Sequence, residues 1–190
     1  MQSAAEPIAR GIFDDRMLVQ IFNDCFFESE LTCLVGGFSE PIYQPSVCRG
    51  QPHQICYRED YFASALHEVA HWCIASESRR QWVDFGYWYA PDGRTPEQQL
   101  AFEKVECKPQ ALEWFFARAC RYPFRVSVDN LSGGFAVPDE NFSHSILSQI
   151  QRWQYNGLPE RAETFFVALS QRYGTSPASG SLHFSIAELK

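Results

Sequence analysis

The segment HEVAH at residues 67–71 constrains the fold of this chain more than any other feature. Residues four apart lie on one face of an α-helix, so His67 and His71 can direct both imidazoles toward a single ion when this segment is helical. The surrounding sequence fits a helix over about residues 60–75 with one apolar side. That side consists of Phe62, Leu66, Val69, Ala70 and Cys73. The sequence therefore predicts a buried helix that carries a metal site.

Glu68 directly follows the first of the two histidines. In a helical H-E-x-x-H pattern the histidines bind a metal ion, and the glutamate acts on a metal-bound water or on a substrate proton. The alternative is that both histidines only pack and form hydrogen bonds, but then every buried polar group needs its own partner. We favour a metal site with His67 and His71 as ligands and Glu68 as the catalytic carboxylate.

Two imidazoles leave a metal site incomplete, and a carboxylate is the expected third ligand. In "AFEKVECKPQALEWFF", Glu106, Gln110 and Glu113 have the spacing i, i+4 and i+7, which places them along one helix face. This polar stripe could face the histidine helix, with one glutamate as ligand and the others supporting it. The alternative is a solvated stripe, because Gln99 and Glu103 extend it.

Among the candidates for the third ligand, we predict Glu106. It precedes Pro109, and a proline is expected to interrupt or kink a helix, which would bring a helix end toward a cleft. Glu113 is the close competitor on the same stripe. His53 is a more distant candidate, because it stands alone in a loop-like segment.

The hydrophobic patterns predict one α+β domain over residues 1–174, with a small mixed sheet packed against helices. A loosely ordered tail is expected at 175–190. Besides the motif helix, the patterns predict helices at 14–27, 95–120, 139–157 and 159–174, and strands at 31–38, 80–90 and 124–138, the last as strand, turn and strand. Residues 39–60 are rich in loop-forming residues and predict at most one edge strand.

Charge and cysteine usage exclude several classes of function. The formal net charge of -7 disfavours binding to nucleic acid or to an anionic membrane. The sequence shows no signal peptide and no apolar run of membrane-spanning length. Its seven cysteines form no C-x-x-C pair. Together these features predict reduced thiols and a cytoplasmic protein.

Two histidines and one carboxylate are found in zinc hydrolases and also in non-haem Fe(II) oxygenases. The residues alone favour the first class, because helical H-E-x-x-H spacing is typical of zinc peptidases with the glutamate as general base.

Four segments together carry a more specific signal: "LHEVAHWCIAS", "DFGYWYAPDGRTPEQQ", "FEKVECKPQALEW" and "FRVSVDNL". Through them the chain resembles elongation factor P hydroxylases over nearly its full length. Trp72 after the second histidine and the "KPQALEW" segment are more specific than the zinc-peptidase pattern. The resemblance implies a small fold like that of metal-dependent ribonucleases that carry a helical histidine motif.

The resemblance also implies an activity, which is hydroxylation of the β-lysylated lysine of elongation factor P, with O₂ as co-substrate and an electron donor still to be identified. The implied metal is Fe(II), although zinc can occupy such sites after purification. His67 and His71 would bind it together with a carboxylate from residues 106–113. Glu68 would then orient the site, contact a substrate amine or transfer a proton. A zinc-dependent hydrolase is the alternative function.

Overall fold

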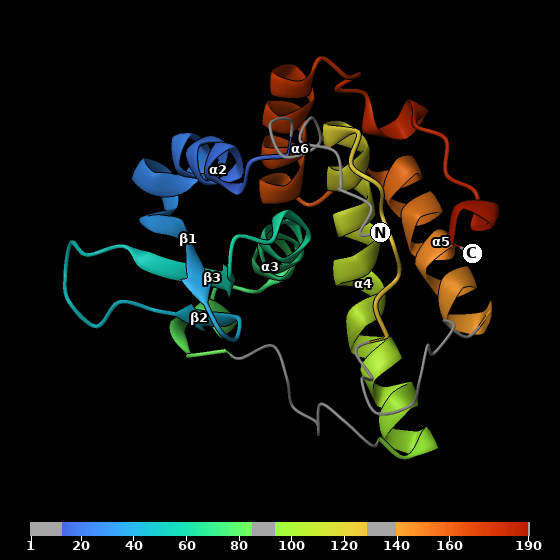
Figure 1. Cartoon of the computed structure of the whole chain (residues 1–190), viewed down its shortest axis with the longest axis horizontal. Coiled ribbons are helices and arrows are strands. Elements are labelled where there is room, and N and C mark those ends of the chain that lie inside the picture. Colours follow the sequence, from blue (N-terminus) through green and yellow to red (C-terminus); the bar gives the residue numbers. More distant parts are fainter. Residues whose placement is uncertain (1–12, 85–93, 129–139, 190) are drawn as a thin grey trace, which may run out of the picture.

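The computed structural model describes residues 13–84, 94–128 and 140–189. Within these ranges, five α-helices and a small mixed sheet enclose one hydrophobic core, which confirms the predicted α+β domain. The motif helix α3 (Phe62–Ile74) lies in the middle, with the sheet on one side and α4 (Pro96–Cys120) on the other (Figure 1). Among the described helices, none is both long and apolar enough to cross a membrane.

The sheet contains β1 (Thr32–Phe38), β2 (Ile42–Gln44) and β3 (His53–Arg58) in the order β1-β3-β2. The central strand β3 runs parallel to β1 and antiparallel to β2. The prediction of at most one edge strand in residues 39–60 was wrong, because two strands lie there and one is central. β3 buries three consecutive residues, Ile55, Cys56 and Tyr57, so it lacks the alternating pattern of a strand with one solvated face.

Local capping signals determine where α2 (Asp15–Glu30) and α4 begin. Asp14 caps α2, because its carboxylate accepts a hydrogen bond from the Arg16 backbone N–H at 3.0 Å. Thr95 and Gln98 form a reciprocal capping box at the start of α4. These starts agree with the predicted helices.

The two C-terminal helices are α5 (Glu140–Asn156) and α6 (Glu160–Tyr173). Each ends just before a glycine with positive φ, 87° at Gly157 and 64° at Gly174, where a side chain would be strained. Beyond α6, residues 175–189 contain two short 3₁₀ helices (Ser179–Ser181 and Ile186–Leu189). Phe184, between them, packs edge-on against Trp114 and Phe115 of α4.

Three other expectations from the sequence need correction. Of the two effects expected of Pro109, interruption of the helix is wrong, because α4 continues through it to Cys120. Residues 80–84 are not a strand: a 3₁₀ turn (Arg79–Gln81) covers the first two of them, and Asp84 forms an isolated bridge with Tyr43. Residues 124–128 have no regular structure. The remaining parts of these two predicted strands, 85–90 and 129–138, lie outside the described residues.

Aromatic packing and one arginine fix the position of α3. Trp72 packs edge-on against Phe22 and Phe26 of α2, with ring centroids 5.2 and 4.9 Å away. The Arg161 guanidinium of α6 lies over the Trp72 indole at 4.9 Å. It also donates hydrogen bonds to the carbonyls of Trp72, Cys73 and Ala75 at the C-terminal end of α3. The C-terminal part of the helix that carries the motif is therefore held by α2 and α6.

Candidate metal centre

Two helices bring three potential metal ligands together. His67 and His71 lie one turn apart on α3, and their Nε2 atoms are 3.0 Å apart. The Glu106 carboxylate approaches from α4, with one oxygen 3.4 Å from His67 Nε2 and the other 3.3 Å from His71 Nε2. One ligand atom from each residue lies within 4.8 Å of the others. The Glu106 side chain is only 4% exposed, whereas each histidine keeps 21% of its surface accessible.

Glu113 contacts the opposite side of the His67 ring. Its carboxylate lies 2.8 Å from Nδ1 of His67, so it accepts a hydrogen bond from an Nδ1–H group. In the neutral ring this leaves the lone pair on Nε2, which faces His71 and Glu106. The two competing glutamates of the stripe thus have different neighbours: Glu106 lies beside both Nε2 atoms, and Glu113 orients one ring.

Gln110, the middle member of the stripe, is fully buried and binds the backbone of Ser127. Its amide nitrogen donates to the Ser127 carbonyl at 2.7 Å, and its oxygen accepts from the Ser127 N–H at 3.1 Å. All three members of the stripe, Glu106, Gln110 and Glu113, are buried, so they are not a solvated face. No sequence signal predicted the contact between Gln110 and Ser127, because Ser127 lies in a segment without regular structure.

The electrostatics of this cluster show why it suits a cation. Burial by itself would lower the pKa of His67, but the hydrogen bond that its Nδ1–H donates to Glu113 and the charges of the nearby carboxylates raise that pKa. Burial would raise the pKa of Glu106, but the adjacent imidazoles of His71 and His67 lower it. For Glu68, burial dominates and raises the pKa.

The carboxylates of Glu106 and Glu113 thus contact the two imidazoles, and that of Glu68 adds a third charge that acts on both rings. With both rings neutral, as metal ligands require, the cluster carries excess negative charge, and an uncompensated buried charge is costly. The two ring nitrogens at 3.0 Å also need a proton or a cation between them. The donor set therefore fits a divalent metal ion.

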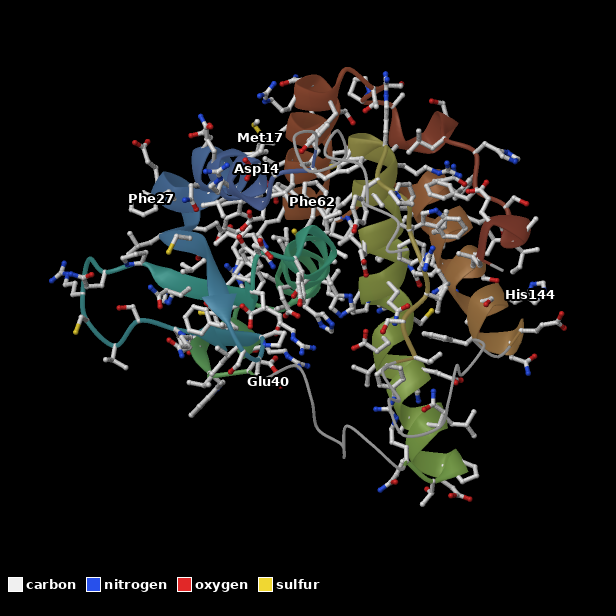
Figure 2. The ribbon with its side chains drawn as sticks, in the orientation of Figure 1. Asp14, Met17, Phe27, Glu40, Phe62 and His144 are labelled. Carbon is white, nitrogen blue, oxygen red and sulfur yellow. The ribbon has the colours of Figure 1, made fainter. Side chains whose placement is uncertain are left out.

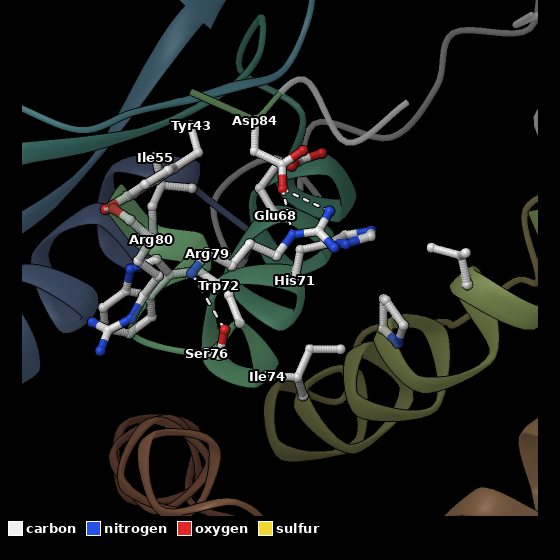
Figure 3. A pocket seen from close by; sticks show the side chains of 13 residues that line it. Tyr43, Ile55, Glu68, His71, Trp72, Ile74, Ser76, Arg79, Arg80 and Asp84 are labelled. Carbon is white, nitrogen blue, oxygen red and sulfur yellow. Dashed lines mark hydrogen bonds and ion pairs between the residues drawn. The ribbon is translucent and has the colours of Figure 1, made fainter. Parts of the chain in front are cut away.

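A pocket of about 330 Å³ opens beside this cluster. His71 and Glu68 contribute to its wall from α3, and Val105 and Pro109 contribute from α4. The remaining wall comes from the sheet, from the end of α3 and from the turn that follows it: Tyr43, Ile55, Trp72, Ile74, Ala75, Ser76, Arg79, Arg80 and Asp84. Figure 3 shows the ion pair between Arg79 and Asp84 on this wall, with Glu68 and His71 nearby. The sequence predicted a cleft beside Glu68 and Glu106, but not the residues of the sheet and of the turn after α3 that form its wall.

The other histidines lie away from the cluster. His53 lies on β3, where its Nδ1 accepts a hydrogen bond from the Ser46 backbone N–H at 2.9 Å. His144 and His183 are exposed. Figure 2 shows His144 on the outer side of α5, with α4 between it and α3.

The fold and the donor set define a small α+β protein with a two-histidine, one-carboxylate group held between two helices. The family model for elongation factor P hydroxylase matches residues 21–183. The chain therefore belongs to the elongation factor P hydroxylase family. A relative from Haemophilus influenzae, named elongation factor P lysine hydroxylase, is 45% identical over 158 residues, which cover 83% of this chain and 88% of that protein.

Proposed function

We propose that this protein is a metal-dependent hydroxylase that acts on a lysine of elongation factor P, in its β-lysylated form, in the cytoplasm. One observation carries the proposal: the donors of His67, His71 and Glu106 converge beside an open pocket, in a member of a hydroxylase family. The name of the Haemophilus influenzae relative supports a lysine of elongation factor P as the substrate. The β-lysylated form of that lysine is what the resemblance of the sequence implies. The pocket is large enough for a lysine side chain and far too small for a folded domain.

In this proposal His67, His71 and Glu106 bind the metal ion, which is Fe(II). Such a donor set leaves coordination positions open, and iron bound there would supply the activation of O₂ for insertion of one oxygen atom into a C–H bond. Two electrons from an external donor and two protons convert the other oxygen atom to water. Glu113 keeps His67 in the tautomer that offers Nε2, through the 2.8 Å hydrogen bond to Nδ1.

The residues of the pocket bind and orient the substrate. Ile55, Val105 and Pro109 provide apolar wall for the methylene groups of a lysine side chain and reduce the access of water. Glu68 borders the same pocket next to His71 and makes no ion pair with a lysine or arginine among the described residues. Its carboxylate can therefore hold the ammonium group of the substrate and exchange a proton with it.

The experiment is hydroxylation of whole elongation factor P, measured by intact mass. The protein is loaded with Fe(II) without oxygen, mixed with β-lysylated elongation factor P and a reductant, and exposed to air. We expect the factor to gain one oxygen atom with the wild type and with His53→Ala, whose histidine lies outside the cluster. The gain should disappear in His71→Ala. If the wild type adds no oxygen with any of several reductants, the proposal is wrong.

A zinc-dependent hydrolase is the second candidate, and the position of Glu68 beside His71 on the pocket wall favours it. This candidate predicts that the zinc-loaded protein cleaves peptides. It also predicts that Glu68→Gln abolishes cleavage while zinc stays bound. Family membership makes the hydroxylase the better supported of the two.

A further inference from the structure

We propose that Gln110 is a positioning residue: its side-chain amide fixes the carboxylate of Glu106 relative to the two imidazoles, and the backbone of Ser127 in turn fixes Gln110. The inference rests on the proposed function, in which Glu106 binds the metal ion. It adds a residue that contacts neither the metal nor the substrate, and it connects the metal centre to the segment 124–128.

Gln110 follows Glu106 by one helical turn, on the same face of α4. It is fully buried, so bulk water does not satisfy its amide group. A buried amide needs partners within the protein, because an unpaired polar group in the core costs free energy. The partners of the Gln110 amide therefore indicate its role.

Two hydrogen bonds to Ser127 hold the Gln110 amide in one orientation. The amide nitrogen donates to the Ser127 carbonyl at 2.7 Å, and the amide oxygen accepts from the Ser127 N–H at 3.1 Å. A half-turn of the amide would place donor against donor and acceptor against acceptor. The amide nitrogen has a second N–H, which remains for another acceptor.

The carboxylate of Glu106 is that acceptor. Burial would raise the pKa of Glu106, but the imidazoles of His71 and His67 lower it, and so does a hydrogen bond from Gln110. The Glu106 side chain is only 4% exposed, so solvent has little access to replace this donor. The amide therefore restricts the rotation of a carboxylate whose oxygens lie 3.4 and 3.3 Å from the two Nε2 atoms.

Ser127 provides a fixed point because contacts on both sides anchor it. The Phe124 ring stacks on Trp114 of α4, with the ring centroids 5.3 Å apart. The Val128 carbonyl accepts a hydrogen bond from the Arg94 guanidinium. An amide bonded to this stretch of chain is ordered before any metal ion binds. Loss of a residue that orients a ligand weakens metal binding by about 10- to 100-fold.

A purely structural role is the competing explanation, in which Gln110 only ties Ser127 to α4 and has no effect on Glu106. The two explanations differ in what loss of the amide changes. Loss of a structural tie lowers the unfolding temperature alone. Loss of a positioning residue also lowers the metal affinity and alters the coordination of the bound ion.

The test compares Gln110→Met with a matched control, Gln154→Met. Methionine is similar in length to glutamine but lacks its amide donor. Gln154 lies on α5, outside the metal centre, and its amide donates to the Leu182 carbonyl at 2.7 Å. Both variants thus lose a hydrogen bond of the same length from a glutamine to the backbone.

Two readouts do not depend on turnover. Each metal-free variant is titrated with Zn²⁺ in competition with a coloured chelator, and the visible absorption of the Co²⁺-loaded protein reports the coordination of the ion. We expect Gln110→Met to weaken Zn²⁺ binding by about 10- to 100-fold and to change the Co²⁺ spectrum. Gln154→Met should match the wild type in both readouts.

A second variant, Gln110→Asn, decides the question if Gln110→Met does not fold. Asparagine retains an amide in the core but is one methylene group shorter, so it cannot bond both Ser127 and Glu106 as glutamine does. We expect Gln110→Asn to weaken Zn²⁺ binding and to change the Co²⁺ spectrum as well.

Several results would overturn the positioning role while leaving the hydroxylase proposal intact. They are Zn²⁺ affinity within about twofold of the wild type in the folded Gln110 variant, an unchanged Co²⁺ spectrum, or an equal loss of affinity in Gln154→Met. Absence of hydroxylation by the wild type, with metal binding that still depends on Gln110, would refute the activity and retain the positioning role. A wild type that binds neither Zn²⁺ nor Co²⁺ would refute the metal site and the positioning role together.

Discussion

Substitution of Glu113 by glutamine tests which glutamate of α4 binds the metal and which one orients a ligand. In the structure, Glu106 lies 3.4 and 3.3 Å from the two Nε2 atoms, whereas Glu113 lies 2.8 Å from Nδ1 of His67. Glu113→Gln removes a negative charge but keeps an oxygen that can accept the hydrogen bond. Glu106→Gln replaces an anionic donor that faces both imidazoles.

The two positions predict different losses of metal affinity. Loss of a residue that orients a ligand weakens metal binding by about 10- to 100-fold, or roughly 1.4–2.7 kcal/mol. Glu113→Gln should weaken metal binding by about tenfold, because the glutamine oxygen still accepts the hydrogen bond from His67. Glu106→Gln should weaken binding by more than about 100-fold, because a ligand itself is lost. Glu103→Gln is the matched control on the same helix, outside the cluster, and should change affinity by less than about twofold.

The assay is titration of the metal-free variants with Zn²⁺ in competition with a coloured chelator, with circular dichroism to verify the fold. The result depends on which of the two variants, Glu113→Gln or Glu106→Gln, loses more metal affinity. If Glu113→Gln weakens binding more than Glu106→Gln, Glu113 is the ligand and the assignment from these distances is wrong. If both match Glu103→Gln, the cluster does not bind the metal.

Further predictions concern stability, and thermal or denaturant unfolding checks each one. Phe165→Ala should lower the free energy of unfolding by about 3–5 kcal/mol, because its fully buried ring packs against three other aromatic rings. Gly36→Ala should cost about 1–3 kcal/mol, since an added Cβ would lie 2.6 Å from the Tyr57 ring; an unchanged midpoint would contradict this packing. Arg161→Met should cost about 1–3 kcal/mol through loss of its hydrogen bonds to the end of α3. Zn²⁺ at about 1,000 times its dissociation constant should stabilise the wild type by about 4 kcal/mol and His71→Ala far less.

The sequence predicted most of the helices, because their signals are local. Thr95 and Gln98 lie three residues apart and form the capping box, and Gly157 and Gly174 end helices through their own backbone conformation. The sequence was less informative about the strands of the sheet. β3 owes its central place to pairing with β1, some 20 residues earlier in the chain, as in the partners Thr32 and His53. The six residues of β3 contain no local signal that predicts such pairing.

In the turn after α3, the sequence predicted a strand that the structure does not contain. Residues 80–84 look like a strand because they include Trp82 and Val83, which favour extended structure. In the structure Arg79, Arg80 and Asp84 instead form contacts with distant residues or with each other. Those contacts fold the segment against Tyr43 and leave both apolar side chains exposed.

The sequence alone was enough to place His67, Glu68 and His71 on one helical turn, and Glu106, Gln110 and Glu113 on one helix face. Both facts depend only on helical periodicity. The folded chain was needed to show which glutamate lies beside the Nε2 atoms, which one lies beside Nδ1, and that a pocket opens next to them. The physical reason is that the offset between α3 and α4 results from packing throughout the core, which no short segment encodes.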